Sequence, residues 1–153
     1  MRVWRICRRA HAADPLGGRG GLYAPGRWHQ RGIRIVYTSA TLSLAVLELL
    51  VRVDRDPLPL DLVQIEIDLP DDLPVERIEA GRLPRSWRRY PAPAALQRFG
   101  AAWIERGTTA VLRVPSAVIP DEDNCLLNPA HPAIERIKVA GRRAFALDSR
   151  LEK

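Results

Sequence analysis

The 153-residue chain is poor in cysteine and aromatic residues and has no long apolar run. With only two isolated cysteines, Cys7 and Cys125, we expect two buried thiols and no disulfide framework. No window approaches 18 uninterrupted apolar residues, so no membrane span is predicted. The first residues also lack the charged stub and apolar stretch of a secretory signal, and we expect a cytoplasmic protein.

Several common catalytic motifs are missing. The three histidines, His11, His29 and His131, fall in no HxH, HExxH or CxxC spacing, so no metal site is expected. The glycines at 17–21 match neither a P-loop nor a dinucleotide-binding GxGxxG, and no GxSxG is present. The usual phosphate-binding loops and the serine nucleophile elbow are therefore not predicted.

The composition is that of an ordinary globular domain. Hydrophobic residues make up 46% of the chain and charged residues 27%, far from the composition of disordered chains. The length is close to that of one typical domain, so residues 1–153 are predicted to form a single domain.

The charge is basic and unevenly distributed. The net charge is +6, and 22 of the 24 cationic side chains are arginine. Residues 1–40 contain eight arginines against Asp14 alone, whereas residues 41–153 contain 16 cations against 17 acids. This asymmetry favours a local anion site over a basic coat that binds nucleic acid. A non-catalytic basic module that binds nucleic acid remains an alternative.

Hydrophobic periodicity and turn residues predict an α+β domain with about six short strands and two helices. The strands are predicted at 3–8, 33–38, 62–69, 109–114, 134–139 and 143–147. One helix begins at Ser39 or Thr41 and runs to about Arg52; the other spans 94–106 and ends at Gly107 as a C-cap. Residues 10–32 and 70–93 are predicted loops, the second with a short helical turn, and 121–124 an acidic turn.

Glu48 is the only acidic residue of the first helix. Leucine, valine and alanine occupy nearly all sides of that helix, which predicts burial nearly all round. Burying a lone carboxylate is very costly, so Glu48 is expected to face a polar cleft or to be paired.

Four other polar residues lie where strands end or loops begin. Arg27 stands between Gly26 and Trp28, where its guanidinium can bind phosphate or carboxylate or can simply pack on the ring. Tyr37 and Ser39 share one strand face, although a core tyrosine and a helix cap fit them too. Ser116 follows Pro115 at a strand end, a position that is also typical of a turn residue.

The order of these features resembles the RES domain family. The resemblance rests on Trp4-Arg5, Tyr23, Gly26-Arg27-Trp28, Val36-Tyr37-Thr38-Ser39, Ala45-Val46-Leu47-Glu48, Val114-Pro115-Ser116-Ala117, the 124–132 run NCLLNPAHP and the 145–151 run FALDSRL. It covers essentially the whole chain, from Trp4 to Leu151. His29 departs from the asparagine that many members carry after the tryptophan.

The resemblance implies a fold similar to that of ADP-ribosyltransferases and the toxin of a type II toxin–antitoxin pair. It also implies degradation of NAD⁺ by glycohydrolysis or phosphorolysis, with growth arrest as the result. An ADP-ribosyltransferase that modifies a protein is the alternative. The implied partners are an Xre-family antitoxin and a second copy of the chain, with NAD⁺ as substrate and no resident cofactor.

The family's Arg, Tyr, Glu and Ser fall on Arg27, Tyr37, Glu48 and Ser116. Cleavage of the nicotinamide–ribose bond develops positive charge on the ribose, which a desolvated carboxylate such as Glu48 stabilises. Arg27 is expected to bind the pyrophosphate and Tyr37 to stack on the nicotinamide. The predicted catalytic residues are thus Glu48, Arg27 and Tyr37, and the predicted substrate-binding residues are Arg5, Tyr23, Trp28, Ser39, Ser116 and Asn128.

Overall fold

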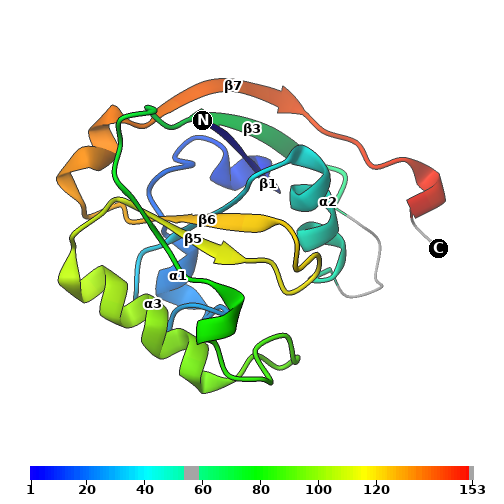
Figure 1. The fold of residues 1–153 in the computed structure, drawn as a ribbon. Coiled ribbons are helices and arrows are strands. Elements are labelled where there is room, and N and C mark those ends of the chain that lie inside the picture. Colours follow the sequence, from blue (N-terminus) through cyan, green and yellow to red (C-terminus); the bar gives the residue numbers. More distant parts are fainter. Residues whose placement is uncertain (54–58, 152–153) are drawn as a thin grey trace.

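A seven-stranded mixed sheet runs through the computed structural model, which describes residues 1–53 and 59–151 (Figure 1). The strands are β1 (Arg2–Arg8), β2 (Val36–Ser39), β3 (Leu62–Asp68), β4 (Val75–Arg77), β5 (Val111–Pro115), β6 (Asp123–Leu127) and β7 (Lys138–Ala144). Their order is β4-β5-β6-β2-β1-β3-β7, with β4 and β5 parallel and the other neighbours antiparallel. The predicted α+β class with a small mixed sheet is confirmed.

Three α-helices accompany this sheet in the described residues: α1 (Gly20–Tyr23), α2 (Leu42–Leu50) and α3 (Ala94–Arg106). Short 3₁₀ turns are η1 (Arg9–His11), η2 (Ala80–Arg82), η3 (Pro132–Arg136) and η4 (Ser149–Leu151). The Thr41 hydroxyl caps α2 by accepting a hydrogen bond from the Leu44 amide at 3.1 Å. Gly107 ends α3 in the left-handed region at φ 57°, as predicted. None of the described helices is long and apolar enough to cross a membrane.

Two apolar clusters lie on opposite faces of β5 and β6. One joins these strands and β2 to β1 and β3, which pass over them in Figure 1, through residues such as Val3, Ile65 and Leu127. The other lies under α3, where Trp103 and Leu96 pack near Leu112 and Leu126. The two cysteines are buried and free, as expected.

The carboxyl-terminal third of the chain departs from the predicted elements. The predicted acidic turn contains the start of β6, because Asp123 is held by Arg113, whose Nη2 lies 2.7 Å from the carboxylate. The two predicted strands at 134–139 and 143–147 are largely replaced by η3 and one strand, β7. The His131 side chain caps η3 by accepting a hydrogen bond from the Ala133 amide, which delays the strand.

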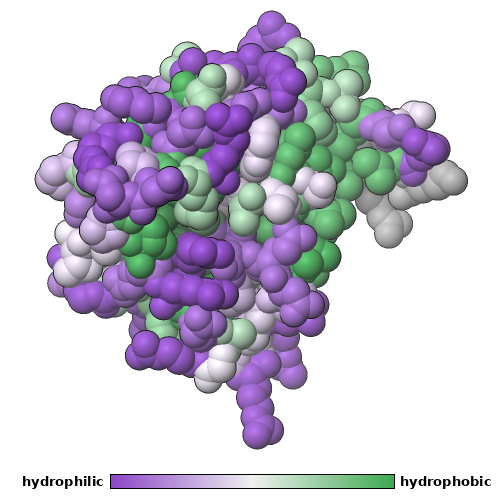
Figure 2. Space-filling model, turned by 45° about the horizontal axis from the view of Figure 1, so that its top comes forward, coloured by the Kyte–Doolittle hydropathy of each residue, from purple (hydrophilic) through white to green (hydrophobic). Residues whose placement is uncertain are grey.

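The expectation that the first helix is buried nearly all round is wrong. Only Leu44 and Ala45 of α2 are buried, whereas Leu47 is exposed and Val51, just past the helix, is 62% exposed. Figure 2 shows hydrophobic residues gathered on its right, the side on which Figure 1 places α2. The helix covers β1 and β2 with one face and leaves an apolar face open.

The junction between β2 and β1 positions the functional site. These antiparallel strands share a single register pair, Trp4 with Ser39, whereas β1 and β3 pair along their whole length. Because the two strands diverge beyond that pair, the sheet opens there, and α2 and the 24–29 loop border the opening.

Candidate active site

A cavity of about 910 Å³ lies at this opening. β1 contributes Trp4, Arg5 and Ile6 to its wall, and β2 contributes Tyr37, Thr38 and Ser39. The remaining lining residues come from α1, the 24–29 loop, Ile35, α2 and the segment after it, the 88–92 loop, Gln97 of α3, the 117–118 segment after β5 and the start of β6. The volume lies near the upper end of ligand pockets, which span about 300–1,000 Å³.

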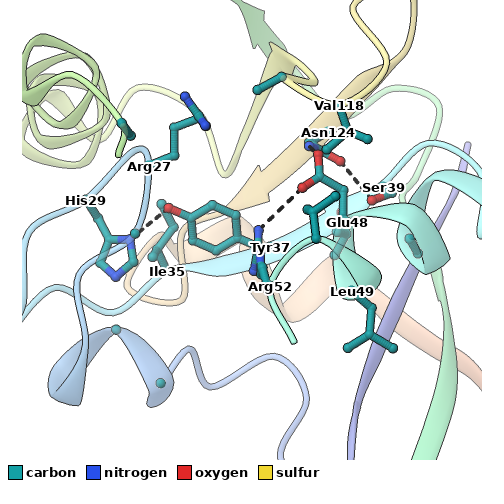
Figure 3. Close-up of a pocket in the computed structure, with 18 of the residues that line it drawn as sticks. Arg27, His29, Ile35, Tyr37, Ser39, Glu48, Leu49, Arg52, Val118 and Asn124 are labelled. Carbon is teal, nitrogen blue, oxygen red and sulfur yellow. Dashed lines mark hydrogen bonds and ion pairs between the residues drawn. The ribbon is translucent and has the colours of Figure 1, made fainter. Parts of the chain in front are cut away.

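Glu48 extends from α2 into the cavity with one carboxylate oxygen held in place. Its Oε1 accepts hydrogen bonds from Ser116 Oγ at 2.8 Å and from Asn124 Nδ2 at 2.6 Å. Its Oε2 lies 3.8 Å from Arg52 Nη2, and the side chain is 16% exposed (Figure 3). Glu48 is therefore both paired and open to the cavity, as its place on an apolar helix predicts.

The two donors to Glu48 are themselves fixed. Ser116 is fully buried, and its hydroxyl oxygen accepts hydrogen bonds from the Val118 and Ile119 amides. Asn124 is oriented by Ser39, whose hydroxyl donates to Asn124 Oδ1 at 2.8 Å. This network connects α2 to the ends of β2 and β6 and fixes the carboxylate before any substrate binds.

The Tyr37 hydroxyl is also fully engaged. It accepts a hydrogen bond from the Trp28 amide at 3.1 Å and lies 2.8 Å from His29 Nδ1. The other imidazole nitrogen, Nε2, lies 3.1 Å from the Ala24 carbonyl oxygen. This arrangement fits a neutral imidazole that donates a hydrogen bond to the Ala24 carbonyl and accepts one from the Tyr37 hydroxyl. Burial lowers the pKa of His29 and raises the pKa of Tyr37 to about 12, so both groups are neutral near pH 7.

The sequence places a glycine where Tyr37 and His29 approach the loop. A Cβ on Gly26 would lie 2.6 Å from both Tyr37 Oη and His29 Cε1, closer than side-chain carbons approach such atoms. Gly26 thus allows the loop to pass close to the tyrosine, and its carbonyl accepts a hydrogen bond from Gln97 of α3.

Arg27 joins the cavity to the 88–92 loop. Its Nη1 donates to the Trp87 carbonyl at 2.6 Å and to the Arg89 carbonyl at 3.2 Å. Burial lowers the pKa of Arg27, but the guanidinium stays protonated at neutral pH. The remaining guanidinium nitrogens have no hydrogen-bond partner in the described residues and can bind an anion.

Three further arginines, Arg5, Arg52 and Arg88, line the cavity, so its charged lining is four cations and one acid, Glu48. Arg5 Nε is buried and has no hydrogen-bond partner among the described residues. A buried unpaired donor on a cation is unusual, because its desolvation is uncompensated. The cavity is thus suited to an anion beside one fixed carboxylate.

Comparison with known proteins identifies the family. The family model described as "RES domain" matches residues 2–148. The chain belongs to the RES domain family. It is 38% identical over 152 residues to the Prs ADP-ribosylating toxin of Sphingobium sp. (strain YBL2), covering 97% of this chain and 94% of that protein. It is 35% identical over 155 residues to Toxin Res of Yersinia enterocolitica, covering 99% and 100%.

A solved structure has the same RES fold. The crystal structure of the M. tuberculosis MbcT–MbcA toxin–antitoxin complex contains a chain that matches with a TM-score of 0.76. The match covers 95% of this chain and 84% of that chain at 16% sequence identity, so it shows the fold alone. With the toxins among its relatives, the chain is a RES-family toxin.

Five of the predicted site residues of this RES-family toxin line the cavity: Arg5, Arg27, Tyr37, Ser39 and Glu48. Ser116 lies behind Glu48 and contacts its carboxylate instead of the cavity. The other three lie outside the cavity lining. Trp28 is 2% exposed in the core, Tyr23 is 72% exposed at the end of α1, and Asn128 is buried after β6, where its side chain accepts from the Ala130 amide.

Sequence reasoning missed four contributors to this site: Asn124, Arg52, His29 and Arg88. Arg52 follows Glu48 by four residues, a spacing that places both on one side of a helix and could have revealed it. Asn124 gave no such signal, because its contact with Glu48 depends on the pairing of β6 with β2. No group of three His, Cys, Asp or Glu side chains suited to a metal occurs within residues 1–53 and 59–151.

Proposed function

We propose that this RES-family toxin cleaves the nicotinamide–ribose bond of NAD⁺. The observation that carries the proposal is the Glu48 carboxylate in the cavity wall, whose Oε1 is fixed by Ser116 and Asn124 while Oε2 lies beside Arg52 without a hydrogen bond. A carboxylate fixed in advance beside a cavity stabilises positive charge that develops during a reaction without reorganising at that moment.

The proposed reaction begins with cleavage of the nicotinamide–ribose bond and ends with transfer of the ribose to an acceptor. As the ribose C1–nitrogen bond breaks, its electron pair goes to the nicotinamide nitrogen, and neutral nicotinamide leaves. The ribose becomes cationic, and Glu48 Oε2 stabilises it electrostatically, as carboxylates do in glycoside cleavage. An acceptor oxygen then bonds to C1 and releases its proton to solvent.

The cavity suits the rest of the dinucleotide. The pyrophosphate carries two negative charges. The free nitrogens of Arg27 offer donors to it, and the positive charge of Arg5, which also lines the cavity, attracts it. The Tyr37 ring lines the cavity and offers a face for the nicotinamide. The hydrogen bonds of its hydroxyl to the Trp28 amide and His29 hold the ring in position.

The acceptor defines the class of reaction. Water gives glycohydrolysis, phosphate gives phosphorolysis, and a protein side chain gives ADP-ribosylation. The last is the second candidate, because the relative from Sphingobium is named an ADP-ribosylating toxin. All three acceptors use the same Glu48 and the same bond cleavage.

The biological setting belongs to the same proposal. We place the chain in the cytoplasm, where NAD⁺ is abundant, as the toxin of a type II pair whose partner is an Xre-family antitoxin. The MbcT–MbcA structure, a toxin–antitoxin complex, supports a protein partner of this kind. We further propose a homodimer, no resident cofactor and no direct contact with nucleic acid.

Product analysis tests the proposal. Purified protein is incubated with NAD⁺ in buffer, in buffer with phosphate, and with cell extract as a source of protein acceptors, and products are identified by mass spectrometry. We expect nicotinamide release in at least one arm, and the ADP-ribose product of that arm identifies the acceptor. Intact NAD⁺ in all three arms would overturn the proposal.

A further inference from the structure

Arg52 lies just past the end of α2, one turn after Glu48, and reaches back into the cavity. Its Nη2 is 3.8 Å from Glu48 Oε2, and its Cζ lies 5.3 Å from the centre of the Tyr37 ring. Figure 3 shows Arg52 lying between the tyrosine ring and the carboxylate. The guanidinium therefore lies beside a negative charge and over an aromatic ring.

The other binding capacity of Glu48 and Tyr37 is already used. Glu48 Oε1 receives two hydrogen bonds, and the Tyr37 hydroxyl contacts the Trp28 amide and His29. Glu48 Oε2 and a face of the Tyr37 ring accept none of these hydrogen bonds, and Arg52 lies beside both of them. They form one subsite, and a side chain of the protein occupies it.

Such a subsite selects a planar delocalised cation. A guanidinium and a pyridinium ring share flatness and a spread positive charge, the features that a carboxylate and an aromatic face recognise. We infer that Arg52 occupies the subsite for the cationic ring of the substrate and competes with it. The identity of that ring as nicotinamide rests on the proposed function; the subsite and its occupant rest on the contacts of Arg52.

The Arg52 guanidinium is held loosely enough to be displaced. The 3.8 Å separation from Glu48 is longer than a hydrogen bond, and the side chain is 57% exposed. Exposed ion pairs of this kind stabilise a structure only slightly, because solvent screens the charges. A substrate cation that reaches Glu48 from the cavity therefore replaces Arg52 at a small free-energy cost.

The direct test is the affinity of Arg52→Gln for 1-methylnicotinamide, a planar cation without phosphates, measured by calorimetry. Removing the competitor is expected to tighten binding about fivefold, or roughly 1 kcal/mol. ADP-ribose, which lacks the cationic ring, is expected to gain no affinity. A urea unfolding curve checks that the variant is folded.

Arg88→Gln is the matched control, because it removes a positive charge from the same cavity. Arg88 Nε donates to the Ala117 carbonyl, and no contact joins Arg88 to Glu48 or Tyr37 in the described residues. We expect no gain in its affinity for 1-methylnicotinamide. An equal gain in both variants would mean that general charge, and not occupancy, governs binding, and would overturn the inference.

Two other outcomes also contradict it: unchanged or weaker binding of 1-methylnicotinamide to Arg52→Gln, and no detectable binding to either form. Because the measurement needs no turnover, it is independent of the reaction. A gain in Arg52→Gln together with intact NAD⁺ in the product assay would overturn the proposed function and leave the cation subsite standing.

Discussion

The two oxygens of Glu48 have different environments. Oε1 accepts hydrogen bonds from Ser116 and Asn124, whereas Oε2 lies 3.8 Å from Arg52, a residue that also lines the cavity. This division means that the residues behind Glu48 position its carboxylate. In the reaction that we propose, their removal is expected to affect turnover more than substrate affinity.

Ser116→Ala tests that division. The variant removes one donor to Glu48 and leaves the Val118 and Ile119 amides without their acceptor. We expect the kcat for NAD⁺ loss to fall by about tenfold to a hundredfold with little change in KM, and stability to fall by about 1–3 kcal/mol. Steady-state kinetics and urea unfolding measure the two effects.

Ser43→Ala is the control for this variant, since Ser43 is exposed on α2, the helix that carries Glu48. It is expected to behave as the wild type in both measurements. A Ser116→Ala variant whose KM rises while kcat is unchanged would place Ser116 in substrate binding, contrary to the positioning role.

His29 is expected to make the stability of the protein depend on pH. Its folded pKa is lowered by burial from the ordinary 6.5, so the unfolded chain takes up the proton more readily. The stability that depends on neutral His29 is complete above pH 6.5 and is lost as the pH falls from there through the lowered folded pKa. Acidification is therefore expected to weaken the connection between His29 and Tyr37.

Unfolding by urea between pH 5 and pH 7 in wild type and His29→Asn measures this effect. Asparagine can still accept the Tyr37 hydrogen bond but does not titrate, and it loses the contact with Ala24, which costs about 1 kcal/mol at pH 7. The wild type is expected to lose more stability on acidification than the variant. Parallel losses would show that His29 does not titrate in this way.

A residue of the site was predictable where a single segment of the sequence shows that the residue is unusual in its surroundings. Glu48 stands out as a lone acid on an apolar helix, and the structure places it in the cavity. Trp28 stands in the same short motif as Arg27, yet only Arg27 lines the cavity, because Trp28 turns into the core beneath α3. Neighbours in a loop take opposite directions, and the sequence motif alone does not separate them.

At the scale of elements, α3 fixes the loop that carries Arg27. Gly100 of α3 lies against the backbone of Trp28, and a Cβ there would collide with the Trp28 carbonyl oxygen. Gly100→Ala is expected to destabilise the protein by about 1–3 kcal/mol, since backbone has to move to make room. Gly81→Ala, where a Cβ meets open space, is expected to change stability little. Equal urea midpoints for the two variants would show that this packing is loose.

Elements with strong periodicity were predictable, and those defined by distant contacts were not. The strand at 62–69 and the helix at 94–106 match β3 and α3 almost to the residue. β6 begins with Asp123 and Asn124, which resemble a turn in sequence and enter a strand because Arg113 and Glu48 contact them. The open face of α2 was not predicted. The spacing of apolar residues shows which faces of a helix are apolar, but it does not show whether another element covers them.

At the scale of the whole molecule, ion pairs offset part of the charge asymmetry. Of the amino-terminal arginines, Arg2 pairs with Asp68 and Glu66, Arg8 with Asp61, and Arg19 with Asp14. Arg5 and Arg27 instead reach the cavity. Folding thus brings two arginines of the first 40 residues to one cavity, which supports a small anionic ligand over a polyanion.

The central claim is that the charge of Glu48 drives cleavage of NAD⁺, and Glu48→Gln tests it most directly. The glutamine carbonyl can still accept from Ser116 and Asn124, so the fold is expected to persist while the negative charge at the cavity is lost.

Glu105→Gln, a change at an exposed acid of α3, is the control. NAD⁺ loss is followed with purified wild type and both variants. We expect loss by Glu48→Gln to fall at least a hundredfold, or about 2.7 kcal/mol, with the control unchanged. A folded Glu48→Gln that keeps more than about a tenth of wild-type turnover would contradict the account.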